Sequence, residues 1–409
     1  MKKITLPLLA ALFPALLFAQ EAKDYSVTLG GFVSSESIFD SRQAVTAREG
    51  DVFLFPAPVS NDANGDDLNA IANFNMFSIH SRLQAKVSGP EMLGARSSAL
   101  LEMDFVGNAN PVISMMRLRH AIIKLEWAKT SLLVGQFWHP FFVLNSYPEV
   151  SGWGGGAPFA VLSRNPQIRF GFKLSNKLSG HISALTQRDF SSTGPGGASP
   201  DYMRNAVVPE VNLNLEYQND GWKAGFVIGQ KTLKPRLKDT EGLKFTKTLS
   251  SFQGNVYLRK DAGNFTAKIQ GLYGENMYNF LMMGGYVESI DPLTGSIEYF
   301  NMKTASVWTE LLLKKGKLTY SVFGGYSKNL GLSSSPDELA EINRYGRGSD
   351  INDTYRIAPR VTLTIHKFAL MTEWSYNMAA YGSVQANGTV SNTTQADGFR
   401  LQTHLKYSF

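Results

Sequence analysis

Arginine residues placed at alternate positions of apolar segments are the feature of this chain that could do chemistry. Arg169 lies between Ile168 and Phe170, and Arg360 and Arg400 lie in similar alternating segments. Successive side chains of a β-strand point to opposite faces, so each guanidinium group would share its face with polar residues. A guanidinium group forms bidentate hydrogen bonds with carboxylate or phosphate. We therefore expect these arginines to contact anionic solutes.

The elements that must position these arginines are strands with a two-residue period. Residues 167–174, 210–217, 355–366 and 399–409 all alternate apolar and polar side chains. A transmembrane strand needs this alternation because one face meets lipid and the other meets the lumen. A soluble β-sandwich or a secreted β-solenoid is the alternative, but it would have to place mid-strand arginines in a dry core. The pattern favours an all-β, transmembrane antiparallel barrel.

Short and long connections alternate along the chain. Seven short polar turns, such as 89–94 and 315–317, alternate with eight longer stretches, such as 41–73 and 378–397. This rhythm predicts about sixteen strands, an even number as in bacterial outer-membrane barrels. The alternation breaks near His120, where we expect a β-bulge.

Composition and the first residues agree with an exported barrel. The chain has 409 residues, no cysteine and a formal net charge of +6. Cysteine-based metal sites are thus excluded, and the modest charge does not indicate a nucleic-acid partner. Residues 1–19 combine two lysines with an apolar stretch, which is typical of a signal peptide. We expect one barrel domain over residues 20–409, surrounded by lipid in the outer membrane of a Gram-negative bacterium.

A barrel of about sixteen strands encloses an aqueous lumen. The residues that the alternation assigns to its lining include His80, Arg82, Glu102, Asp104, Arg117, Arg119, Arg169, Arg356, Arg360 and Arg400. Four of them, Arg82, Arg169, Arg360 and Arg400, are expected to form a row at mid-depth. Basic groups in a narrow lumen concentrate anions, so we expect anion preference. The alternative is that these groups pair with inner carboxylates such as Glu210 and Glu310.

The third long connection, 138–166, is expected to fold into the lumen and constrict it. Its aromatic and glycine-rich composition suits packing inside a wall. The residues assigned to the constriction are Gln136, Trp138, His139 and Trp153. Connection 274–303 is equally long and remains an alternative for this role.

Four short motifs follow one another in the first third of the chain. They are Ser81–Leu83 (SRL), Leu101–Phe105 (LEMDF), Arg117–Ala121 (RLRHA) and Leu133–Trp138 (LVGQFW). Over residues 26–140 the chain resembles the DcaP-like family of trimeric outer-membrane porins. The resemblance implies a sixteen-stranded homotrimer that passes small anionic solutes such as dicarboxylates. It also supports Arg82, Arg117 and Arg119 as pore residues, and Gln136 and Trp138 as the start of a constricting loop.

Two other function classes stay open at this point. The barrel could be a scaffold for adhesion or loop-mediated binding, and some barrels are hydrolases. A hydrolase needs a nucleophile, a base and an orienting group within hydrogen-bond reach. His80 and Ser81 should face opposite sides, and His139 and His404 have no evident serine or carboxylate partner. We therefore expect no enzymatic activity.

No cofactor or metal ion is expected. The acidic stretch 62–67 (DANGDD) has oxygen ligands that suit calcium. It lacks the glycine at the sixth position and the terminal glutamate of a calcium-binding loop. We interpret it as a solvated loop.

Overall fold

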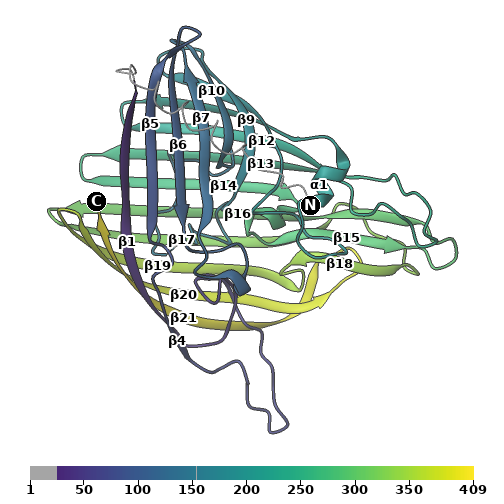
Figure 1. Ribbon diagram of the computed structural model, residues 1–409. Helices are drawn as coiled ribbons and strands as arrows, with labels where there is room; N and C mark the ends of the chain where they lie inside the picture. The colour runs from purple at the N-terminus through teal and green to yellow at the C-terminus, as the bar shows by residue number, and fades with distance from the viewer. Residues whose placement is uncertain (1–24, 153) are drawn as a thin grey trace, which may run out of the picture.

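The strands of the chain close into one antiparallel barrel (Figure 1). The computed structural model describes residues 25–152 and 154–409. The predicted signal peptide 1–19 and Trp153 lie outside the described residues. In order around the barrel, the wall consists of β1 (Ser26–Asp40), β4 (Asn73–Phe77) continued by β5 (Arg82–Met92), β6 (Ala95–Asp104), β7 (Arg117–Glu126), β8 (Thr130–Trp138), β9 (Arg164–Lys173), β10 (Leu178–Leu185), β11 (Glu210–Asn219), β12 (Trp222–Leu233), β13 (Leu249–Ala262), β14 (Phe265–Glu275), β16 (Ile297–Lys315), β17 (Leu318–Leu332), β19 (Ile351–Ile365), β20 (Phe368–Val384) and β21 (Val390–Ser408).

Closure of the barrel rests on β1, which pairs with β21 along one edge and with β4 and β5 along the other. With β4 and β5 counted as one strand, sixteen strands form the wall, as the alternating turns predicted. In Figure 1 the near strands β5 and β6 cross the far strands β14 and β16, because strands of a closed barrel are tilted against its axis. Among the described residues, no helix is long and apolar enough to cross a bilayer.

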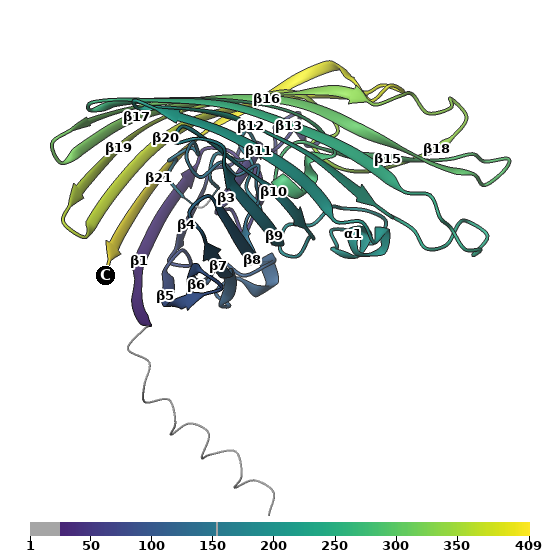
Figure 2. The same ribbon diagram turned by 90° about the horizontal axis from the view of Figure 1, so that it is seen from above.

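The wall is low on one side and tall on the other. We call β4–β10 the low wall, in which β5 to β10 have 8–11 residues each. We call β11–β21 the tall wall, in which β16, β20 and β21 reach 17–19 residues. Two further strands, β15 (Gly284–Ile290) and β18 (Glu341–Arg347), pair with each other and extend the tall wall (Figure 2).

Several long connections are shorter than the sequence predicted, among them 378–397 and 138–166. Connection 378–397 is a hairpin instead, since β20 and β21 stay paired as far as Val384 and Val390. Connection 138–166 shrinks to 139–163, because Arg164 at the start of β9 pairs with Trp138. Both extensions lie at strand ends, where the outer face need not be apolar and the alternation is therefore weak. The predicted short turns all join neighbouring strands of the wall.

An irregularity in β7 confirms the predicted bulge. Glu102 of β6 faces His120, whereas the next residue, Met103, faces Leu118. Arg119 is thus the extra residue of β7, and both Arg119 and His120 are buried on the inner side. A break that the sequence did not indicate separates β4 from β5, where the Ser81 hydroxyl donates to the Ser78 carbonyl oxygen (2.9 Å).

Candidate functional site

Loop 139–163 lies against inward-facing side chains of the tall wall. At its start, His139 Nε2 lies 2.8 Å from Glu210 Oε1 of β11. Near its middle, the Ser151 amide donates to Glu373 of β20 (2.9 Å). Towards its end, Arg356 of β19 donates to the Ala157 carbonyl oxygen (3.0 Å). These contacts tie one loop to strands far apart in the wall.

Aromatic side chains also pack the loop against the wall. The Phe159 ring covers Gly325 of β17 so closely that a Cβ at Gly325 would lie 2.4 Å from it. Only glycine leaves that space. Trp138, the last residue of β8, stacks on Phe142 with ring centroids 3.9 Å apart. The loop is therefore packed against the wall at both ends.

Two residues assigned to the constriction have mainly anchoring contacts. Gln136 donates to the carbonyl oxygens of Leu118 (3.0 Å) and Arg119 (3.2 Å), across the bulge of β7. The expectation that His139 lacks a carboxylate partner was wrong, because Glu210 lies 71 residues further along the chain and the strand order brings it close. Since the Phe141 amide donates to the other ring nitrogen, Nδ1 (3.2 Å), His139 has no free nitrogen to act as a base.

A cavity of about 530 Å³ lies between loop 139–163 and the wall. Its charged or titratable lining residues are His80, Arg82, Arg119, Tyr147, Glu149, Arg360, His404 and Lys406. Four of these side chains are cationic, and Glu149 is the carboxylate among them. Lys406, which the alternation of the last strand also assigned to the inner face, lies in this lining. The cavity is thus rich in positive charge.

Much of the positive charge of the low wall is paired within the wall. Asp104 accepts from Arg117 Nε (2.7 Å) and from Arg119 Nη1 (2.7 Å), while Glu102 accepts from Arg119 Nε (2.7 Å). Arg82 lies 3.6 Å from the same Glu102 oxygen and keeps a quarter of its side chain exposed. Arg164 and Arg117 both approach Asp189, at 3.5 and 3.4 Å. Four guanidinium groups therefore share three carboxylates.

The four arginines expected to form one row line three separate cavities. Arg82 and Arg360 share the cavity of about 530 Å³. Arg169 lines another of about 170 Å³, where it donates to Gln167 Oε1 and to the Trp138 carbonyl oxygen (2.8 Å). Arg400 lines a third with Arg356, and Asp40 holds it through two contacts of 2.7 Å.

A second inward segment, which the sequence did not reveal, lines the cavity of Arg400 with Asp51 and Phe53. Strands β2 (Ala44–Ala47) and β3 (Val52–Pro56) form a hairpin within the connection 41–72, and all five residues of β3 are buried. Arg356 donates to the Phe53 carbonyl oxygen (3.1 Å), and Arg400 donates to that of Gly50 (2.8 Å). The uninterrupted apolar run VFLFP was the available signal, because burial on both faces removes alternation.

The acidic stretch 62–67 uses its carboxylates for its own turn. Asp62 Oδ1 accepts from the amides of Asn64 (2.8 Å) and Asp66 (3.0 Å). Asp67 Oδ2 lies 2.6 Å from Arg42 Nη1. Among the described residues, the side chains that lie close enough together to bind a metal ion are Glu36, His80 and His404, which are not part of this stretch.

Comparison with known proteins gives a match at the level of fold. No family model matches the sequence, and no curated protein matches it either. The solved outer-membrane channel DcaP of Acinetobacter baumannii superposes with a TM-score of 0.70 at 16% identity, covering 94% of this chain and 98% of that one. An anion-selective porin from Comamonas acidovorans gives 0.59 at 12% identity (94% and 100% covered). The trimer form of OmpT from Vibrio cholerae gives 0.57 at 10% identity (94% and 100% covered). The fold is that of an outer-membrane porin barrel.

Proposed function

We propose that the protein is an outer-membrane porin through which small anionic solutes, dicarboxylates among them, diffuse passively. The observation that carries this proposal is the lining of the cavity of about 530 Å³, in which Arg82, Arg119, Arg360 and Lys406 outnumber the single carboxylate Glu149. Charge of one sign on the walls of an aqueous passage raises the local concentration of the opposite ion.

Pairing within the wall leaves some of this charge for a solute. Arg82 shares Glu102 with Arg119 and remains partly exposed. Within the described part of the chain, no carboxylate lies within 4.0 Å of Lys406 Nζ; its nearest recorded partner is the Phe32 ring, 5.2 Å away. Arg82 approaches the same ring at 5.0 Å. Both cations approach the same ring and line the same cavity, and a guanidinium group can bind a carboxylate bidentately.

We assign the constriction to loop 139–163. Its middle carries Tyr147 and Glu149 into the lining of the main cavity. Lys268 of β14 holds this part of the loop, since its Nζ donates to the Tyr147 carbonyl oxygen (3.0 Å) and to Glu149 Oε1 (2.7 Å). A loop fixed in this way sets a constant passage width.

The outer surface supports a homotrimer associated through the low wall. The exposed tyrosine and tryptophan residues of the strands are Tyr217, Trp222, Tyr273, Tyr320, Tyr326, Trp374, Tyr376 and Tyr407, all in the tall wall. Among the described residues of β4–β10, the exposed large apolar side chains are aliphatic, methionine or phenylalanine. Belts of tyrosine and tryptophan mark surfaces that face lipid, so the absence of exposed tyrosine and tryptophan from the described strands β4–β10 suits a face covered by other subunits. The Vibrio cholerae neighbour also has a trimer form.

Planar-bilayer recordings test the proposal. In a potassium chloride gradient we expect a reversal potential that indicates anion preference, and competition of dicarboxylates with the chloride current. The double variant Arg82→Gln/Lys406→Gln should lower the anion-to-cation permeability ratio. The control Arg204→Gln, which changes an exposed arginine of the short helix α1 (Asp201–Ala206), should not. Cation preference of the unmodified protein would overturn the anionic specificity. A folded barrel with no conductance would instead favour a binding scaffold.

A further inference from the structure

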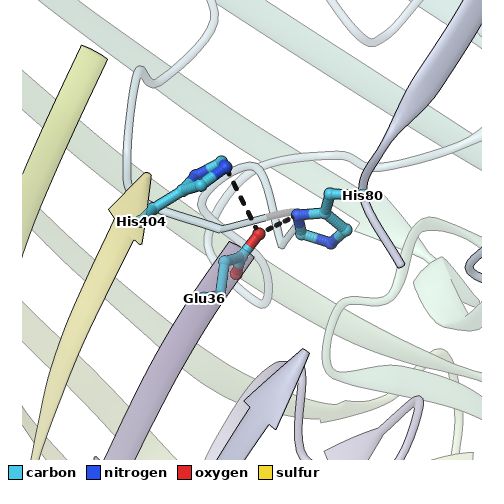
Figure 3. Close-up of side chains that lie close together, drawn as sticks. All are labelled: Glu36, His80 and His404. Carbon is cyan, nitrogen blue, oxygen red and sulfur yellow. Dashed lines mark ion pairs between the residues drawn. The ribbon is translucent and has the colours of Figure 1, made fainter. Parts of the chain in front are cut away.

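Glu36, His80 and His404 converge at one point of the inner wall (Figure 3). Glu36 belongs to β1, His404 to the neighbouring β21, and His80 to the break between β4 and β5. One ligand atom from each residue lies within 4.8 Å of the other two. All three residues are buried: Glu36 is 1% exposed, His80 5% and His404 7%. We propose that they form a binding site for a divalent transition-metal ion of the zinc type.

The chemistry of the three groups suits zinc. Two imidazole nitrogens and one carboxylate oxygen are common protein ligands of Zn²⁺, which forms bonds of about 2.0–2.2 Å to them. Three protein ligands leave the fourth tetrahedral position for water or another oxygen donor. Ligand atoms of such a site lie about 3.4 Å apart. His404 Nε2 is already 3.6 Å from Glu36 Oε1.

Neighbouring residues orient two of the three ligands. His80 Nε2 lies 3.0 Å from Asp51 Oδ2, so the Nε2 proton points to Asp51 and Nδ1 points to Glu36. A carboxylate that accepts the other ring N–H is the usual outer partner of a metal-bound histidine. Gln402 Nε2 donates to Glu36 Oε2 (2.7 Å), which turns Oε1 towards both histidines.

The environment of His404 is an independent indication that this site binds a ligand. Its imidazole is buried, yet within the described residues neither ring nitrogen has a hydrogen-bond partner. A buried polar group without a partner costs free energy, and a metal ion would satisfy Nε2. The packing of His80 against His404, with ring centroids 6.0 Å apart, holds both rings at the site.

The site is open to the lumen. His80 and His404 both line the cavity of about 530 Å³, so an ion can enter from it and present its open position to it. The inference does not depend on the proposed transport function.

Metal titration of the full-length protein, purified in detergent and stripped with a chelator, tests the site. We expect one Zn²⁺ per chain, and a visible absorption band of tetrahedral Co²⁺ when cobalt replaces zinc. His404→Gln and Glu36→Gln should each weaken Zn²⁺ binding by more than about 100-fold, and the outer variant Asp51→Asn by about 10–100-fold. The matched control is His366→Asn, which changes an exposed histidine in a short turn whose positive φ asparagine tolerates.

Two results would overturn the proposal. One is that the unmodified protein takes up neither Zn²⁺ nor Co²⁺ stoichiometrically. The other is that uptake survives in both His404→Gln and Glu36→Gln. Heat-dependent gel mobility shows whether each variant is folded, and conductance measured with chelator present tests the channel separately from the metal site.

Discussion

The low and tall walls use their inward charges in different ways. On the low wall, Arg117 and Arg119 pair with Asp104 of the adjacent strand. On the tall wall, Lys268 and Glu373 instead reach loop 139–163, at the Tyr147 carbonyl oxygen and the Ser151 amide. Charges of the tall wall therefore hold loop 139–163, while Arg117 and Arg119 of the low wall pair mainly with carboxylates of the neighbouring strand. This difference predicts that equivalent substitutions have unequal effects on the two walls.

The largest expected effect is that of removing the shared carboxylate of the low wall. Asp104→Asn leaves the buried Arg117 and Arg119 without their common partner, and breaking a buried ion pair in this way costs about 3–5 kcal/mol. On the tall wall, Glu373→Gln keeps an oxygen acceptor for the Ser151 amide and should cost about 1 kcal/mol. Urea unfolding of both variants in detergent measures the free energies of unfolding. Equal losses would contradict the distinction between the walls.

The contrast between the walls also explains what the sequence could predict. Membrane and lumen impose a two-residue period on every spanning strand, so local alternation was enough to predict the barrel and its turns. The bulge at Arg119 was visible as a break in that alternation. The ion-pair partners of the arginines could not be predicted. Arg400 and Asp40, for example, are 360 residues apart in the chain and meet only when the barrel closes. The β2–β3 hairpin was hidden because it lies inside the lumen, where no face meets lipid.

The next effect separates a lipid-facing surface from a subunit interface. Ile269 of β14 and Ile123 of β7 both point outward, with 46% and 63% of their surfaces exposed. Ile269→Arg places a charge on a lipid-facing surface and should lower the free energy of unfolding by up to about 2–4 kcal/mol, with the trimer retained. Ile123→Arg should instead yield monomers. Light scattering during size-exclusion chromatography reports the oligomeric state, and trimeric Ile123→Arg protein would exclude the low wall as the interface.

A smaller effect distinguishes charge that meets solute from charge that holds the loop. Arg82→Gln should lower the anion-to-cation permeability ratio about fivefold, since one charge about 4 Å from an ion in water contributes about 1 kcal/mol. Lys268→Gln should change single-channel conductance more than selectivity, because it releases the loop at Tyr147 and Glu149. Bilayer recordings of the two variants in the same salt gradient give both quantities. Identical changes in both variants would mean that the loop and the low wall act as one unit.

The smallest effect compares two carboxylates outside the membrane-spanning strands, one beside each wall. The Ser60 amide, assisted by Arg42, lowers the pKa of Asp67 below its ordinary value of 3.8, and the Leu293 and Thr294 amides lower that of Asp291. A carboxylate with a lowered pKa stabilises its turn above that ordinary value and stops doing so as the pH falls through the folded pKa. Hydrogen exchange at the Ser60 and Leu293 amides, corrected for intrinsic rates, should therefore show that protection is lost in acid at both.

High salt should weaken protection at the Ser60 amide alone, because only Asp67 of the two carboxylates has an arginine partner, 2.6 Å away. Equal salt sensitivity at both turns would show that the ion pair with Arg42 adds nothing to the loop.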